Sequence, residues 1–187
     1  MHELPAATAR GEHPESALVV AGHGDDLDDL ELGWSTQQTS SEPQTNVGPC
    51  IESNPNAIGG GFPLFLKSSS NNKLSAWLGT TSYEVSGSGW VAETTEPPTA
   101  TLDFDDNDVV FWKGQTGTAI WYSYNTGTSL VFGGPPVWSK QAKVPGAETN
   151  AAPSVAEAIG TADAVAVLAW KNATDDTVWY MDPSLLP

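Results

Sequence analysis

Short apolar runs alternate with polar turn clusters along most of this chain. The runs are rich in Val, Ile, Leu, Trp and Tyr, and clusters of Gly, Asn, Asp, Ser and Pro separate them at intervals of about ten residues. This rhythm is typical of β-sandwiches, barrels and propellers, so it predicts an all-β fold in which helix is nearly absent. Only residues 154–159 have a composition that suits a helix, and the repeat described below places a strand there.

One sequence pattern occurs twice in the second half of the chain. Its anchors are two tryptophan pairs, Trp112 with Trp121 and Trp170 with Trp179. In both pairs the tryptophans are nine residues apart and flank a polar turn. Each pair predicts a β-hairpin, over residues 108–124 and 164–180, and the shared spacing predicts that the two hairpins superpose as units of a repeat. Weaker copies of the same frame are anchored at Leu66 and Gly22.

The repeat frame divides the chain into units of propeller-blade size. The anchors at positions 22, 66, 112 and 170 are spaced by 44, 46 and 58 residues. In the best copy the expected strands are 100–104, 108–112, 119–124 and 137–144. Four strands in about 45 residues is typical of a β-propeller blade.

We therefore predict a single β-propeller domain built from about four four-stranded repeats. The expected repeats are 16–55, 56–98, 99–149 and 150–187. The last unit stops after its third strand, and residues 1–8 resemble the end of a fourth strand, so we expect them to complete the last blade. The units close either as a four-bladed ring or, through oligomerisation, as part of a larger ring.

The best-preserved segment resembles a known repeat family. The residues that carry the resemblance are Trp112-Lys113-Gly114, Ile120-Trp121-Tyr122-Ser123, Trp138-Ser139, Gln141, Val144-Pro145-Gly146 and Pro153-Ser154. This pattern is similar to the tandem repeat of bacterial and fungal lectin-like propellers, including the Photorhabdus-type seven-bladed fucose-binding lectins. The resemblance implies a non-catalytic propeller that binds carbohydrate. This chain has fewer units than those lectins, which leaves its ring size open.

The charge of the chain narrows the choice of partner. It has 23 acidic residues against 7 lysines and arginines, for a net charge of −16. Such a surface repels phosphate backbones and anionic headgroups, so we expect no nucleic-acid or membrane partner. Glycans or glycoproteins are the expected partners, and a homo-oligomer is left open. The longest apolar run, 164–170, is too short to span a bilayer, and the N-terminus lacks the pattern of a signal peptide, so a soluble protein is expected, secreted or cytoplasmic.

Motifs for catalysis are weak. The segment 123–127 resembles the Asp-box turn of sialidases, with Asn125 in the Asp position, and that turn is structural. Sialidase chemistry needs several arginines to bind a carboxylate, whereas Arg10 is the only arginine. The histidines are His2, His13 and His23. They have no Gly-x-Ser-x-Gly motif beside them, and Cys50 has no nearby histidine, so we expect no enzyme; a hydrolase with an acidic site is the third hypothesis.

Two acidic segments suggest calcium, and both also fit turns. The candidate ion ligands of the stronger segment are Asp25, Asp26, Asp28 and Asp29, followed by Glu31. The second segment is Asp103-x-Asp105-x-Asn107, which lacks the Gly and distal Glu of a helix–loop–helix site. Turn chemistry is the favoured interpretation of both, and no cofactor is expected.

The tryptophans and tyrosines of the repeat remain as candidates for a ligand site. They are either core residues of the blades or exposed rings on which a sugar stacks beside polar side chains. Because neighbours in a strand point to opposite faces, Trp121 and Tyr122 cannot both be core. The predicted carbohydrate-binding residues are Trp112, Lys113, Tyr122, Trp138, Trp170, Lys171 and Tyr180. The leading hypothesis is a lectin-like protein, and the alternative is a structural or protein–protein interaction module.

Overall fold

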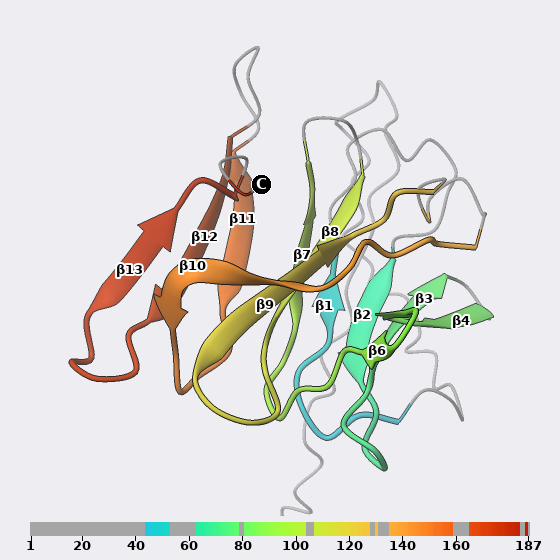
Figure 1. The fold of residues 1–187 in the computed structure, drawn as a ribbon, viewed down its shortest axis with the longest axis horizontal. Helices are drawn as coiled ribbons and strands as arrows, with labels where there is room; N and C mark the ends of the chain where they lie inside the picture. Colours follow the sequence, from blue (N-terminus) through green and yellow to red (C-terminus); the bar gives the residue numbers. More distant parts are fainter. Residues whose placement is uncertain are drawn as a thin grey trace, which may run out of the picture. The chain divides into compact units, whose positions relative to one another are not determined.

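The computed structural model describes residues 44–52, 63–78, 81–103, 107–127, 130, 135–158, 165–183 and 186 (Figure 1). Over these residues the fold is all-β, as predicted, with strands in antiparallel sheets that do not close into a ring. The same residues contain no α-helix, and therefore none that could cross a membrane. The predicted strand at 1–8, the three histidines and the acidic segment at 25–31 lie outside the described residues.

The first sheet is a meander of four antiparallel strands. They are β1 (Cys50–Ile51), β2 (Leu64–Lys67), β3 (Leu74–Leu78) and β4 (Thr81–Glu84). A small hairpin follows, made of β5 (Ser86–Gly87) and β6 (Trp90–Val91). Because β1 pairs with β2, the repeat boundary expected after residue 55 falls inside this sheet.

The second sheet is also a four-stranded meander. Its strands are β7 (Thr99–Leu102), β8 (Asp108–Lys113), β9 (Ala119–Tyr124) and β10 (Ala142–Glu148). The first three strands confirm the prediction to within two residues, but the fourth begins at Ala142 and not at 137. Ser139 explains the difference, because its hydroxyl accepts the backbone N–H of Tyr124 at 3.1 Å and so interrupts the pairing of strands. Before this point Trp138 forms only an isolated bridge with Asn125.

The third sheet contains three strands among the described residues. They are β11 (Ser154–Ala158), β12 (Val165–Lys171) and β13 (Val178–Met181), in that order, with β13 at one edge. The expectation of a strand and not a helix is thus confirmed over residues 154–158, and residue 159 lies outside the described residues. All five residues of β11 pair with β12, which commits this segment to the sheet.

The three main hairpins share one register. β8 and β9 pair Trp112 with Trp121, and β12 and β13 pair Trp170 with Trp179. One residue nearer the turn, each hairpin pairs a lysine with an aliphatic residue: Lys67 with Leu74, Lys113 with Ile120 and Lys171 with Val178. Equal registers place equivalent side chains on equivalent faces, so positions can be compared between sheets one by one.

Two hydrophobic cores lie between the sheets. The first contains Phe65, Leu74, Ala76, Ala100, Val110 and Trp112, from the first and second sheets. The second contains Val109, Phe111, Ile120, Tyr122, Val144, Leu168 and Trp170, from the second and third sheets. Since successive residues of a strand face opposite ways, β8 supplies both cores, and all six of its residues are buried.

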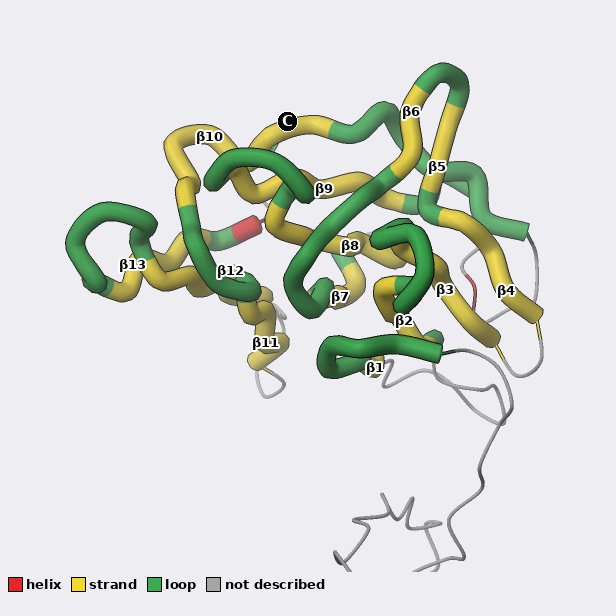
Figure 2. The backbone as a smooth tube through the Cα atoms, turned by 90° about the horizontal axis from the view of Figure 1, so that it is seen from below, coloured by secondary structure: helices red, strands yellow, loops and turns green. Residues whose placement is uncertain are grey.

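The first strands of the three sheets lie side by side, with β7 between β1 and β11 (Figures 1 and 2). The side chain that begins each strand reaches the next one. Cys50 Sγ accepts the N–H of Ala100 at 3.2 Å, and Thr99 Oγ1 accepts the N–H of Val155 at 3.0 Å. Ser154 begins β11 and is the third member of this series.

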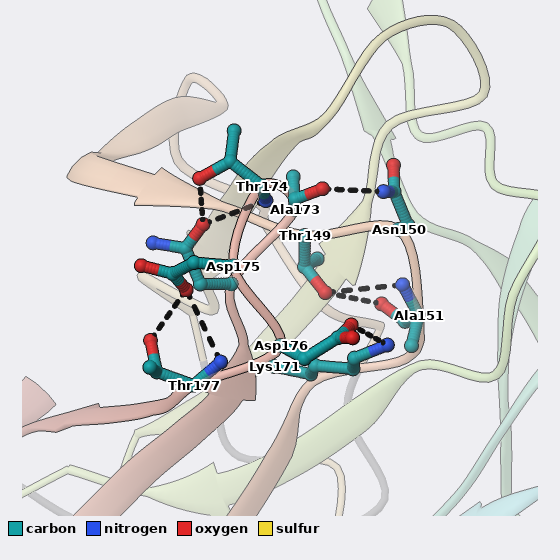
Figure 3. Close-up of polar contacts among 10 residues, drawn as sticks. Thr149, Asn150, Ala151, Lys171, Ala173, Thr174, Asp175, Asp176 and Thr177 are labelled. Carbon is teal, nitrogen blue, oxygen red and sulfur yellow. Dashed lines mark hydrogen bonds and ion pairs between the residues drawn. The ribbon is translucent and has the colours of Figure 1, made fainter.

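A threonine turn precedes the first strand of each of the three sheets. The threonines are Thr45, Thr94 and Thr149, and each hydroxyl bonds both the N–H and the carbonyl of the residue two positions later. The carbonyl just before each threonine accepts an N–H from the turn of the following hairpin. The donors are Ser69, Gln115 and Ala173, and the acceptors are Gln44, Glu93 and Glu148. The same contact therefore recurs three times, and Figure 3 shows the surroundings of the last one.

Candidate functional site

Four of the predicted binding rings are core residues. Trp112, Tyr122, Trp138 and Trp170 expose only 1, 4, 8 and 6 % of their surface. Trp112 and Trp138 pack in the first core, and Tyr122 and Trp170 in the second. A sugar can stack only on a ring whose face is exposed, so the prediction that these four rings bind sugar is wrong. They are core residues, because a neighbouring sheet packs over them.

The predicted lysines divide in the same way. Lys113 is buried, and its ammonium donates to the carbonyl of Gly114 at 3.3 Å. Lys171, at the equivalent position of the third sheet, is exposed. Tyr180 is also exposed, at 77 %. Of the seven predicted residues, Lys171 and Tyr180 alone are open to a ligand, and their binding role stays a prediction.

The structure brings Lys171 and Tyr180 together on one face of the third sheet. Directly paired residues in an antiparallel sheet point to the same side. Ala169 pairs with Tyr180, and Lys171 pairs with Val178, so these four side chains share a face. We call this the outer face; it also contains Ser154, Ala156 and Val167.

One row of paired residues across the outer face has side chains that could contact a small ligand, and we call this row the platform. Ser154 pairs with Ala169, which pairs with Tyr180, so a hydroxyl and an exposed ring flank a methyl group. The equivalent row of the second sheet is Thr99, Phe111 and Tyr122, in which Phe111 is fully buried. Alanine in place of phenylalanine leaves open the volume beside Tyr180 that an aromatic ring fills in the second sheet.

A polar turn ends this platform (Figure 3). Lys171 Nζ lies 2.5 Å from Asp176 Oδ1, and Asp176 has a left-handed backbone, φ 59°, which brings its carboxylate back toward the strand. Both side chains are largely in solvent, so this ion pair contributes little stability and can open for a ligand. The site therefore offers a cation, a carboxylate and the Ser154 hydroxyl around one exposed ring.

The same turn positions Trp179 on the opposite face of β13. The indole Nε1 donates to Thr177 Oγ1 at 2.7 Å, and Thr177 Oγ1 donates to Asp175 Oδ1 at 2.6 Å. Hydrogen bonds from the Thr177 hydroxyl and backbone N–H lower the pKa of Asp175 below its ordinary value. Trp179 is 50 % exposed, so the turn fixes an indole that remains open to solvent.

Sequence reasoning overlooked Ser154 as a site residue, although a signal was present. Each threonine of the junction turns is followed four residues later by proline and five later by Cys50, Thr99 or Ser154. That spacing marks the start of the first strand in each of the three main sheets. The residue at this start carries a hydroxyl or a thiol in all three.

Two predicted polar segments serve as turns. Asp103 Oδ1 accepts the backbone N–H of Asn107 at 2.8 Å, and both carboxylate oxygens accept its side-chain amide. Asn125 Oδ1 accepts the N–H groups of Gly127 and Val137, while its amide donates to Asp108. These bonds are the ones that the turn interpretation predicts for both segments, and residues 104–106 lie outside the described residues. Within the described residues, no group of three His, Cys, Asp or Glu side chains could hold a metal ion.

Comparison with protein-family models and with curated protein sequences gave no match to this chain.

Proposed function

We propose that this protein is a non-catalytic, lectin-like module that binds glycans on the outer face of its third sheet. Tyr180 supplies the stacking ring, Ala169 the space beside it, and Ser154 and Lys171 the hydrogen-bond donors. The site lies on a β-propeller arrangement, in which the three successive meanders are blades around their first strands. The meander order of the sheets and the contacts among β1, β7 and β11 support that arrangement.

The observation that carries the proposal is the exposure of Tyr180. A large amphipathic ring with 77 % of its surface in solvent, beside a small residue and between polar groups, suits the apolar face and the hydroxyls of a sugar. One such platform buries little area, so we expect weak binding at a single site, strengthened where glycans are presented in many copies.

A glycan array with the labelled full-length chain tests the proposal. Tyr180→Ala is expected to lower binding at least about tenfold, because the stacking ring is lost. Ala169→Phe is expected to block the platform by filling the space that Phe111 fills in the second sheet. Tyr124→Ala is the matched control, since Tyr124 is an exposed tyrosine, at 37 %, on another sheet.

The proposal is wrong if no glycan binds the wild-type chain, or if Tyr180→Ala and Ala169→Phe bind as the wild type does. Circular dichroism of both variants shows whether they are folded. Their substituted residues lie on the outer face, so loss of binding with an unchanged spectrum assigns the effect to the site.

A second candidate function is protein–protein interaction, and the edge strand β13 favours it. Val178, Trp179 and Tyr180 are 72, 50 and 77 % exposed, and β13 pairs with β12 alone among the described strands. An apolar edge strand is a template for pairing with a strand of another chain. A pull-down of glycan-free partners, reduced by Trp179→Ala, distinguishes this function from glycan binding.

A further inference from the structure

The second sheet shows what a fourth strand does beside the tryptophan hairpin. β10 pairs with β9 so that Ala142 lies opposite Tyr122 and Lys143 opposite Trp121. The Lys143 ammonium lies 5.2 Å from the centre of the Trp121 ring. A cation at this distance over an indole is attracted by the negative face of the ring. The fourth strand thus contributes a small residue beside the tyrosine and a cation above the tryptophan.

The third sheet has the same hairpin without that strand. Trp179 and Tyr180 of β13 occupy the positions of Trp121 and Tyr122, because both hairpins have the same register. In the described part of the chain no strand pairs with the outer edge of β13. The indole of Trp179 is held in place by Thr177, so its ring is positioned before any partner arrives.

The charges around β13 favour a basic occupant. Asp175 and Asp176 precede the strand and Asp182 follows it directly, while the strand itself has no charged residue. One cation lies beside them, Lys171, which forms an ion pair with Asp176, so the acidic groups outnumber the basic ones by three to one. The chain as a whole carries −16. An acidic protein attracts basic segments and repels copies of itself. A second copy is also a poor donor, because its β10 is already paired with β9 and its β13 has no cation. Residues 1–8, which the sequence analysis expects to complete this blade, contain no lysine or arginine to place over Trp179.

We propose that β13 is the docking site for an extended, basic segment of another protein. The segment adds as an antiparallel fourth strand, with a small residue opposite Tyr180 and a lysine or arginine over Trp179. Backbone hydrogen bonds along the edge supply affinity, and the cation over the indole supplies selectivity for sequence. This inference rests on the protein-interaction function and not on glycan binding. The cation of the segment lies over Trp179 on the face opposite the glycan platform, and only the small residue opposite Tyr180 lies on the outer face.

A capped, fluorescent peptide with the sequence of residues 139–148 is the probe, because it contains the Ala142-Lys143 pair in its native setting. Binding to the full-length chain is measured by fluorescence anisotropy. The Lys143→Gln peptide is expected to bind about two- to fivefold more weakly, the size of an exposed cation–π contact. Trp179→Leu in the protein keeps apolar bulk but removes the ring, and both peptides should bind it equally.

The controls separate docking from other events. Tyr124→Ala should leave the affinity of both peptides unchanged, and raised salt should weaken binding of the native peptide. Backbone amide shifts in NMR spectra should be largest at residues 178–181. The proposal is overturned if the native peptide shows no saturable binding. It is also overturned if Lys143→Gln lowers the affinity equally for the wild-type and Trp179→Leu chains. A third contrary result would be amide shifts confined to β9, which would mean that the peptide exchanges with β10. A negative glycan array leaves these results unaffected, so the two functions fail separately.

Discussion

The second and third sheets place the same hairpin in two different surroundings. Tyr122 and Tyr180 are equivalent by register, yet the first exposes 4 % of its surface and the second 77 %. Ile120 and Val178 differ in the same direction, at 0 and 72 %. The third sheet covers this face of the second sheet, whereas no described residue covers the outer face of the third.

The role of an aromatic residue in these sheets therefore depends on what packs against its face and not on its position in the hairpin. The sequence also differs at the critical point. Phe111, which fills the interface in the second sheet, is replaced by Ala169 in the third. A face that has alanine where the second sheet has phenylalanine, next to an exposed tyrosine, is better suited to a small ligand than to another sheet.

Alanine at the two equivalent tyrosines should affect stability very differently. Tyr122→Ala should lower the free energy of unfolding by about 3–5 kcal/mol, because it removes a ring from a packed core and leaves a cavity beside Phe111. Tyr180→Ala should change it by less than about 0.5 kcal/mol, since the ring is exposed. Urea unfolding followed by circular dichroism measures both. Equal losses would mean that the outer face is covered in solution.

Much of the fold was predictable because local patterns decide it. The polar turns and β-branched runs placed β7, β8 and β9, and the nine-residue tryptophan spacing predicted the register of two hairpins. The start of β10 was missed, because a single side chain, Ser139, replaces a backbone partner of Tyr124. No local pattern announces such a substitution.

The candidate site was only partly predictable, for a different reason. The residues next to Trp112 and Trp170 in the sequence do not show whether these rings are buried. Their burial depends on which sheet packs against them. Lys171 and Tyr180 are exposed because they lie on the outer face of the last described sheet, and their binding role remains a prediction. The sequence shows that Ser154 follows a threonine and a proline at the same spacing as Cys50 and Thr99. That these positions begin the first strands became clear only from the hydrogen bonds that Cys50 and Thr99 make between sheets.

The side chains that begin the first strands should contribute less to stability than the core tyrosine. Cys50, Thr99 and Ser154 hold equivalent positions, and burial raises the pKa of the Cys50 thiol although the N–H of Ala100 and a bond from Thr99 oppose the shift. Cys50→Thr supplies another acceptor and should stay within about 1 kcal/mol of the wild type. Cys50→Val leaves the N–H of Ala100 without an acceptor and should cost about 1–3 kcal/mol more than Cys50→Thr in urea unfolding. If the two variants are equally stable, the inter-sheet bond at Cys50 contributes nothing.

The smallest expected effect concerns the turn that holds Trp179. The pKa of Asp175 is lowered in the folded chain, so the bonded carboxylate stabilises the turn above the ordinary pKa of aspartate, and that contribution is lost as the pH falls through the lowered value. Protonation removes the negative charge of the carboxylate and so weakens its hydrogen bond from the Thr177 hydroxyl, which in turn orients the indole of Trp179. We therefore expect the fluorescence of Trp179, taken as the difference between the wild type and Trp179→Phe, to be constant from neutral pH down to about pH 4 and to change below it. Asp175→Asn should show the acidic signal at neutral pH, whereas Asp176→Asn, which affects only the ion pair with Lys171, should titrate as the wild type does. If the difference signal titrates near neutral pH, or if Asp175→Asn leaves it unchanged, then Trp179 is oriented by a group other than this carboxylate. The ring on which strand docking depends would then not be held in place by this turn.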